Sequence, residues 1–408
     1  MPKKVKIYPP LGAAALKAVK YPAIKVSTFL QTGYVKRQVE DGSWVGIHQA
    51  ATMSGYPDVY CYLAHWICKS RKAKQDFQMK TASNQRSRMA LIPAALTLFL
   101  TAFLCGFTTS VQAHNHEPLD LDGLLKAFGW DFDTAEIKVE KLTDNFFVLF
   151  GIGGNIGVSV GENGTMIVDD QFPQMMPKIE EALAGLPGSQ GKKVDFAINT
   201  HWHFDHAEGN LSLGPAGTWI VAQENSREMM QDDHVINLAV VKYLQKAYPD
   251  QALPVITYKD RMRFHFNGEQ IDLLHFGPAH TTGDTAVYFR GTNAVHFGDV
   301  FNRGYPFIDA DNGGDIDGMA AFCESVLQVI EKDTRVIPGH GEVGTYNDLA
   351  AYISMLKTIS LRIGGMISDG LTVEQVAAAK PTAQYDKVYG DPTGFVNRVY
   401  ASLIKKKP

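Results

Sequence analysis

Apolar and polar positions along residues 137–168 fall into four short runs separated by turns. Ile137 to Leu142 alternates residue by residue, and continuous apolar runs follow at 146–150, 156–160 and 165–168. Alternation is typical of a half-buried strand, and short apolar runs bounded by turns are typical of buried strands. Turns rich in Asn and Gly join the four runs. The pattern predicts a sheet that begins with antiparallel hairpins.

Beyond residue 168 the pattern changes to helices mixed with strands. Met176 to Leu186 is expected to form the first helix, because Pro187 and Gly188 end its apolar period. Further strands are expected at 194–199, 218–222, 270–276, 285–289, 294–297 and 335–337, and helices at 223–232, 235–246 and 317–332. This mixture is typical of an α/β layered domain.

The tail, residues 347–407, predicts three helices separated at Asp369-Gly370 and Lys380-Pro381. Gly and Pro end helices, so these two dipeptides mark the boundaries. We expect the tail to pack against the sheets, with a lid or an oligomer contact as the second possibility.

Charge divides the chain, whose formal net charge is −4. Residues 1–88 hold 15 Lys and Arg against 4 Asp and Glu, and residues 89–113 hold no charged side chain. The remaining residues hold 24 basic and 39 acidic side chains. The overall value therefore averages a basic opening segment and an acidic main part.

Residues 79–113 have the layout of an export signal. Basic residues precede an apolar run at 90–107, and Val111-Gln112-Ala113 offers the small residues of a cleavage site. A membrane span is the alternative, since about 18 apolar residues reach across a bilayer. Pro93 and Gly106 interrupt the run, however, and no basic cluster follows it. We expect cleavage after Ala113 and a periplasmic or secreted protein without membrane attachment.

The basic segment 1–78 is of doubtful origin, because a signal peptide is expected at the start of a protein. Initiation at Met79 or Met89 is the favoured interpretation. A nucleic-acid-binding arm is the alternative, but the apolar residues of this segment show no sustained period. We therefore expect no nucleic-acid partner.

A cluster of potential metal ligands lies at residues 199–210, directly after a predicted strand. His201 and His203 are two residues apart, so an extended backbone directs both side chains to one side. Asp205 and His206 come after the chain turns and are able to face a second metal. Imidazole and carboxylate groups together suit Zn²⁺. A lone His-x-His pair often has no metal role, but Asp and His at these added offsets indicate a metal loop.

Three later segments supply further ligands, each at or just after a predicted strand. His280 offers a third imidazole for the first metal, Asp299 a carboxylate between two metals, and His340 an imidazole for the second. Glycines flank each of them and let the backbone approach the metals. Each segment is a weak signal alone, and together they predict one site assembled from several loops.

The motif His-x-His-x-Asp-His, followed by His280, Asp299 and His340, resembles the metallo-β-lactamase superfamily over residues 137–344. The resemblance implies an αββα four-layer sandwich at 114–345, with a short C-terminal helical extension at 346–408. It also implies a dinuclear Zn²⁺ site at one edge of the sandwich.

The resemblance assigns the individual ligands as well. The first zinc ion would take His201, His203 and His280, and the second Asp205, His206 and His340, with Asp299 between them. Asp169 would support the metal loop from behind the ligands, although Asp170 is an alternative.

The resemblance further implies a hydrolase in which metal-bound hydroxide attacks a carbonyl group, with Asp205 orienting it and carrying its proton. The substrate would be a small molecule such as a β-lactam, a lactone or another ester or amide. Asp299 stands where the best-known β-lactamases carry Cys or Ser, and Asp is usual there in glyoxalase II-like thioesterases, lactonases and phosphodiesterases. Export argues against a cytosolic thioesterase.

Two alternatives remain open, a glyoxalase II-like thioesterase and an oxidoreductase that resembles the mononuclear iron persulfide dioxygenases. The second would leave His206 and His340 without a role. Asn302 and Arg303 follow Asp299 and are expected to rim the cleft, where Arg303 would pair with a substrate carboxylate or remain solvated. The pattern indicates no particular oligomeric state.

Overall fold

The computed structural model describes residues 117–405 and two earlier strands, β1 (Tyr34–Gln38) and β2 (Trp44–His48), which pair antiparallel. The expected signal segment at 79–113 lies outside the described residues, so cleavage and export stay predictions. Two compact units divide the chain near residue 109, and the fold below is that of the second. Within residues 117–405 the structure contains no helix with the length and apolar character needed to span a membrane.

The first sheet has seven strands in the order β11-β8-β7-β6-β5-β4-β3. Its first four strands along the chain pair antiparallel, as the hairpin pattern predicts. The next three join in parallel. The strands are β3 (Lys138–Lys141), β4 (Phe146–Phe150), β5 (Ile156–Gly161), β6 (Gly164–Val168), β7 (Phe196–Ile198), β8 (Trp219–Gln223) and β11 (Ile256–Tyr258).

The second sheet has six strands that follow one another in chain order. Only β15 and β16 pair in parallel, and the other neighbours are antiparallel. The strands are β12 (Arg261–Phe266), β13 (Glu269–Leu274), β14 (Ala286–Phe289), β15 (Ala294–His296), β16 (Arg335–Ile337) and β17 (Gly344–Thr345).

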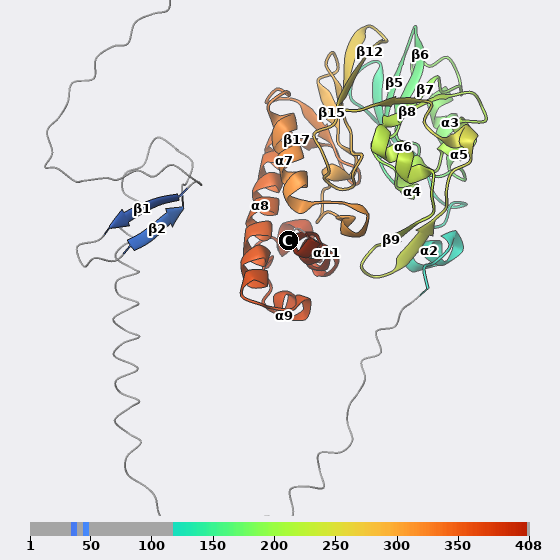
Figure 1. Ribbon diagram of the computed structural model, residues 1–408. Coiled ribbons are helices and arrows are strands. Elements are labelled where there is room, and N and C mark those ends of the chain that lie inside the picture. Colours follow the sequence, from blue (N-terminus) through green and yellow to red (C-terminus); the bar gives the residue numbers. More distant parts are fainter. Residues whose placement is uncertain (1–33, 39–43, 49–116, 406–408) are drawn as a thin grey trace, which may run out of the picture. The chain divides into compact units, whose positions relative to one another are not determined.

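Side chains along a strand alternate between the two faces of its sheet, and each sheet packs against the other sheet on one face and against helices on the other. Two sheets and two helical layers make four layers. Along β4, Phe146 and Val148 face the second sheet, whereas Phe147 and Leu149 face the helical layer that contains α3 (Met176–Ala184). The outer face of the second sheet packs against α7 (Ile316–Leu327) and α8 (Tyr346–Ser368). Figure 1 shows α7 and α8 on one side of the sandwich and α3 to α6 on the other. The fold is the αββα sandwich that the sequence predicts.

Shorter helices complete the domain. They are α2 (Leu121–Phe128), α4 (Phe204–Ala207), α5 (Asn210–Leu213), α6 (Glu224–Met230), α9 (Val373–Ala378), α10 (Asp386–Tyr389) and α11 (Thr393–Lys405), with 3₁₀ turns η1 (Asp250–Ala252), η2 (Gly298–Val300) and η3 (Ala310–Asn312). The tail therefore holds four helices rather than the predicted three, because α10 forms a short turn between α9 and α11.

The predicted helix at 235–246 is wrong, because this segment forms a hairpin of β9 (His234–Asn237) and β10 (Lys242–Gln245). Long-range contacts decide its conformation. Tyr243 Oη donates to Glu208 Oε1 at 3.1 Å, and Gln245 Nε2 donates to the Trp202 carbonyl at 2.8 Å. Local spacing carries no information about such partners, so tertiary pairing overrides the helical pattern.

β3 is also less buried than predicted. All four of its residues are exposed, although its sequence alternates in the manner of a half-buried strand. β3 is the last strand of the first sheet and pairs only with β4. Its position at the sheet edge leaves its side chains without a covering layer.

Phe146 provides a test of the packing between the sheets. Its ring is fully buried and lies 4.5 Å from the ring of Phe289, between centroids. Phe146→Ala should lower the free energy of unfolding by about 3–5 kcal/mol, because it leaves a cavity in a close-packed interior. Chemical denaturation measures this change. Val139→Ala on exposed β3 is the control and should change stability by no more than about 0.5 kcal/mol, whereas equal effects would contradict the assigned core.

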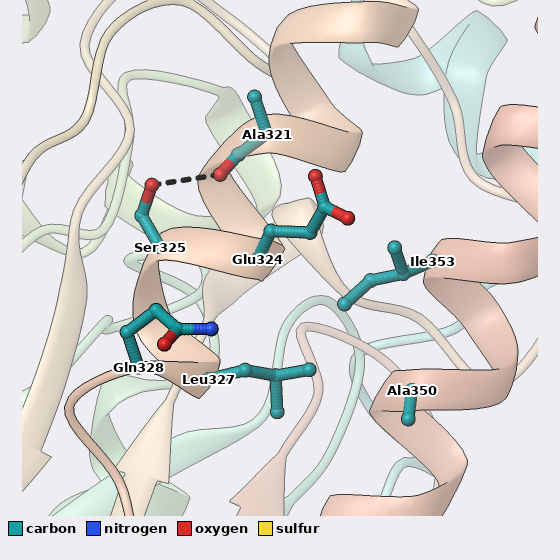
Figure 2. Close-up of a pocket in the computed structure, with 7 residues that line it drawn as sticks. All are labelled: Ala321, Glu324, Ser325, Leu327, Gln328, Ala350 and Ile353. Atoms are coloured by element: carbon teal, nitrogen blue, oxygen red, sulfur yellow. Dashed lines mark hydrogen bonds between the residues drawn. The ribbon is translucent and has the colours of Figure 1, made fainter. Parts of the chain in front are cut away.

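A shallow pocket lies between α7 and α8 (Figure 2), and none of the candidate metal ligands lines it. Glu324 and Gln328 of α7 and Ile353 of α8 line it, and Ser325 Oγ within it donates to the Ala321 carbonyl at 2.8 Å. Glu324 in turn accepts a hydrogen bond from Lys357 at 2.7 Å. The pocket offers no group for the chemistry predicted above.

Candidate metal centre

The predicted ligands come together because the strands that precede them end at the same edge of the sandwich. The loop with His201 follows β7, Asp299 follows β15, and His340 follows β16. β15 and β16 run parallel, so their carboxyl ends lie together. His280 comes from the connection between β13 and β14.

The metal loop is shaped by its apolar residues. Trp202 and Phe204, which alternate with the ligands along the loop, are buried. The backbone is extended at His203, and α4 begins at Phe204. Asp205 and His206 consequently lie on a helical turn, whereas His201 lies in a bend of the chain before the extended His203.

The first group of ligand atoms belongs to His201, His203 and His280, which lie within 4.8 Å of one another. His203 Nδ1 is 2.8 Å from His280 Nε2. All three side chains are buried. This is the set that the sequence assigns to the first metal.

The second group belongs to Asp205, His206 and His340. His340 Nε2 lies 3.2 Å from both His206 Nε2 and Asp205 Oδ2. Asp299 lies between the groups, with Oδ1 at 3.2 Å from His206 Nε2 and Oδ2 at 3.7 Å from His280 Nε2. The structure therefore brings all seven predicted ligands into one cluster.

Hydrogen bonds on the far sides of four imidazole rings fix their orientation. Their acceptors are the Phe307 carbonyl for His280 Nδ1 at 2.8 Å, Asp309 Oδ2 for His203 Nε2 at 3.0 Å, Asp169 Oδ2 for His206 Nδ1 at 2.7 Å, and Thr200 Oγ1 for His201 Nδ1 at 3.0 Å. Thr200 donates its own hydroxyl proton to Asp169 Oδ2, so its oxygen must accept from His201. These partners assign the tautomer of each ring.

The donor set fits a divalent cation. When the ring protons point to these outer acceptors, His203 Nδ1 and His280 Nε2 face each other with their lone pairs. His206 Nε2 and His340 Nε2 face each other in the same way when the proton of His340 is on Nδ1. His201 Nε2 and Asp299 Oδ1 are buried without a hydrogen-bond partner. Unpartnered buried acceptors are costly, and facing lone pairs repel one another. A cation in each group satisfies all of these atoms at once.

The electrostatics of the two groups differ. In the second group, burial favours neutral imidazoles, but Asp299 and Asp205 outweigh burial and raise the pKa values of His206 and His340. In the first group, burial prevails. Burial, together with the neighbouring His206 and His280, holds the pKa of His201 well below its usual value. Burial also lowers the pKa of His280. For Asp299, burial favours the neutral form, but His340 and His206 outweigh it and hold the pKa of the carboxyl well below its usual range. Neutral imidazole and carboxylate are the forms that bind metals.

Asp169, rather than its neighbour Asp170, contacts the ring of a ligand. Its Oδ1 accepts from the Thr200 amide at 2.7 Å, and its Oδ2 contacts Thr200 Oγ1 and His206 Nδ1. Its backbone φ of 65° lies in the left-handed region, which turns the side chain after β6 back toward the loop. Asp170 instead accepts from Asn199 at 3.0 Å.

Asn302 and Arg303, expected at the cleft rim, have partners within the protein. Asn302 Oδ1 accepts from the His340 amide at 2.8 Å and so holds the backbone of a ligand. Arg303 forms an ion pair with Asp348 at 3.1 Å, and its side chain is 38 % exposed. Asn302 therefore positions His340. Of the two interpretations of Arg303, a surface side chain fits better than a partner for a substrate carboxylate.

Sequence reasoning missed Asp309, the Phe307 carbonyl and Thr200 as partners of the ligand rings. Asp309 lies 106 residues from His203, and no fixed spacing connects the two. A backbone carbonyl leaves no signal in the sequence. Thr200 could have been found, because it is adjacent to His201 and its hydroxyl is able to accept from the ring.

Gly339 provides a test of the close packing around the ligands. A Cβ at this position would overlap Asp299 Oδ1 and backbone next to it. Gly339→Ala should therefore displace Asp299 and weaken the binding of Zn²⁺, used as the probe ion, at least about tenfold, the scale at which disturbed ligand orientation affects metal sites. Competition with a chromophoric chelator measures the affinity. Gly365→Ala on α8 is the matched control, because a Cβ there meets nothing within 4 Å, and zinc affinity equal to that control would refute the assigned geometry.

Comparison with known proteins places this site in a family. Residues 150–340, which include all seven predicted ligands, match the model of the metallo-beta-lactamase superfamily. The chain is 25 % identical over 194 residues to the 2,4-dinitroanisole O-demethylase subunit alpha of Nocardioides sp. (strain JS1661), covering 46 % of this chain and 52 % of that protein. The chain thus spans about half the length of this curated relative.

Two solved structures align with this chain. The metallo-beta-lactamase from Pontibacter korlensis aligns with 54 % of this chain and 99 % of its own, at 18 % identity and a TM-score of 0.43. The inverting sec-alkylsulfatase Pisa1 from Pseudomonas sp. aligns with 66 % of this chain and 51 % of its own, at 14 % identity and a TM-score of 0.50. The match to the family model identifies residues 150–340 as a domain of the metallo-beta-lactamase superfamily.

Proposed function

We propose that the protein is a dinuclear zinc-dependent hydrolase that acts on a small molecule with a carbonyl group, such as a β-lactam, a lactone or another ester or amide. One observation carries the proposal. Two groups of imidazole lone pairs converge on either side of a shared carboxylate, Asp299, and each group needs a cation.

His201, His203 and His280 would hold one ion, and Asp205, His206 and His340 the other, with Asp299 between them. Zinc bound there would lower the pKa of water and polarise a substrate carbonyl. All of these ligands are imidazoles or carboxylates, and none is a cysteine. Such hard and borderline donors suit zinc.

The exposure of the ligands indicates the side from which a substrate enters. The side chain of His340 is 39 % exposed, and those of Asp205 and Asp299 are 14 % and 10 % exposed. The imidazoles of the first group are almost fully buried. A substrate would therefore approach past His340 and meet the cluster at Asp205 and Asp299.

Asp205 is suited to move a proton at this entrance. Burial favours its neutral form, but His206 and His340 outweigh burial and lower the pKa of the carboxyl. Asp205 is thus ionised at neutral pH, and its carboxylate would take a proton from an attacking water and pass it to the leaving group.

The alternatives differ in what they ask of the site. A glyoxalase II-like thioesterase would use the same seven side chains on a thioester. A mononuclear iron oxygenase would need only the first group, although His206 and His340 point into the same cluster. Cleavage of an aryl methyl ether is a further candidate, because the curated relative is named a 2,4-dinitroanisole O-demethylase subunit.

Metal analysis with a substrate panel tests the proposal. Protein beginning at His114 is expected to contain two zinc ions and to hydrolyse a β-lactam, a lactone or another ester or amide. A thioester, a phosphodiester and 2,4-dinitroanisole, measured side by side, distinguish the alternatives. His340→Ala should lose one zinc ion and turnover, whereas His265→Ala on exposed β12 should keep both. A single iron ion with oxygen uptake would overturn the proposal.

We also propose that the protein is exported and cleaved after Ala113, as the uncharged segment at 89–113 suggests. N-terminal sequencing of the protein from culture medium or periplasm should then begin at His114. A cytoplasmic protein with the segment intact would refute export.

A further inference from the structure

The C-terminal helix α11 contacts a loop that lies directly behind the first ligand group. We call residues 307–312 the backing loop. Arg398 of α11 donates from Nε to the Ile308 carbonyl at 3.1 Å and from Nη1 to Asp311 Oδ2 at 3.0 Å. Lys405, at the end of the same helix, donates to the Ala310 carbonyl at 2.6 Å. Both cations of α11 that reach the loop hold its backbone.

The backing loop in turn orients two of the three rings in the first group. The Phe307 carbonyl accepts from His280 Nδ1, and Asp309 Oδ2 accepts from His203 Nε2. The Asp309 amide also donates to the His280 carbonyl at 3.0 Å. A shift of this loop would therefore rotate both rings away from their convergent position.

Arg398 is built into this arrangement rather than placed on the surface. Only 4 % of the residue is exposed, and its guanidinium carbon lies 5.7 Å from the centre of the Phe307 ring. The Phe307 ring itself lies 5.6 Å from the His280 ring. A buried guanidinium is costly unless its partners are held in place, so Arg398 and the backing loop constrain each other.

The shape of the guanidinium matters here. Arg398 contacts a carbonyl, a carboxylate and an aromatic face at once, which requires a planar group with several fixed donors. A lysine has a single ammonium group and cannot reproduce the three contacts. The role therefore depends on arginine and not on charge alone.

We propose that Arg398 is a positioning residue for the first metal, acting through Phe307 and Asp309 on His280 and His203. The inference rests on the proposed zinc site. The ligands of the second group have no contact with the backing loop among the hydrogen bonds and ion pairs of residues 117–405. The effect should therefore fall on one of the two ions.

The test is zinc affinity of the full chain, measured by competition with a chromophoric chelator. Wild-type protein should bind two ions, and Arg398→Gln should weaken one of them about tenfold, the lower end of the range for residues that orient ligands. Arg398→Lys should restore little of this loss. Arg362→Gln is the matched control, because Arg362 of α8 binds the Pro381 carbonyl and Gln384, within the C-terminal helices but away from the ligands.

A double-mutant cycle separates positioning from general stability. Asp309→Asn should weaken the same ion, and adding Arg398→Gln should then have little further effect, because both act on the same loop. Additive losses, or normal affinity for both ions in a folded Arg398→Gln variant, would overturn the inference. If Arg398→Gln does not fold, Arg398→Lys is measured in its place against the same outcomes. A wild-type chain that binds fewer than two zinc ions refutes the proposed function itself and is recognised before any variant is made.

Discussion

Asp205→Asn should reduce hydrolysis by about 10²–10⁴-fold while the protein stays folded. The substitution keeps the size of the side chain but removes its negative charge, so the residue no longer accepts a proton from the attacking water. Asp205 is the carboxylate of the cluster best placed for this role, because its Oδ2 lies 3.2 Å from the exposed His340 and its pKa is lowered by His206 and His340. The turnover number of the best substrate from the panel measures the loss.

Metal content must be followed in the same variant, because Asp205 is also an expected ligand of the second ion. Turnover measured at zinc concentrations that saturate the variant separates the two roles. Asp233→Asn is the control, since Asp233 pairs with Lys246 on the surface at 2.7 Å and lies outside the cluster. Full turnover in zinc-saturated Asp205→Asn would refute proton transfer by this residue.

Most of the ligand cluster could be predicted from the sequence because metal ligation leaves a local pattern. His201, His203, Asp205 and His206 stand at short fixed offsets, and each later ligand follows an apolar strand. The structure shows why ligands distant in sequence become neighbours, since β15 and β16 run parallel and their carboxyl ends lie together. The apolar runs indicated an α/β layered domain, and the family resemblance implied its αββα order.

The groups that orient the ligands were harder to predict, because they depend on tertiary contacts without a local signature. Asp169 was found through a resemblance and a strand end, and the structure shows how its left-handed backbone aims it at the loop. Asp309 lies in an acidic, glycine-rich stretch whose carboxylates look equivalent in sequence. Only the fold shows that Asp309 accepts a hydrogen bond from His203 and that Asp311 accepts one from Arg398.

The predicted helix at 235–246, where the structure has the hairpin of β9 and β10, was wrong for the same physical reason. Its apolar residues recur at a spacing compatible with a helix, and a backbone chooses between helix and strand by small differences in propensity. Residue Leu119 adds to β10, donating to the Lys242 carbonyl at 2.7 Å and accepting from the Leu244 amide at 3.0 Å. A partner more than a hundred residues away thus decides the conformation.

Removal of zinc should lower the melting temperature of the protein by at least about 10 °C. Each ion that binds only the folded state stabilises it by about 4 kcal/mol when its free concentration is a thousand times its dissociation constant. A domain of this size loses about 2–4 °C for each kcal/mol, and two ions add their effects. Without them, His201 Nε2 is buried and unpartnered, and the facing nitrogens of His203 and His280 remain 2.8 Å apart.

Calorimetry of chelator-treated and untreated protein measures the change, with metal analysis confirming that zinc has been removed. Returning two equivalents of Zn²⁺ should restore the melting temperature, and Mg²⁺ should not, because Mg²⁺ prefers oxygen ligands and this cluster is mainly imidazole. His201→Ala should respond less to chelation than the wild type, since it has already lost a ligand of the first ion. An unchanged melting temperature after verified removal would mean that these five imidazoles hold no stabilising metal, and the dinuclear site would have to be abandoned.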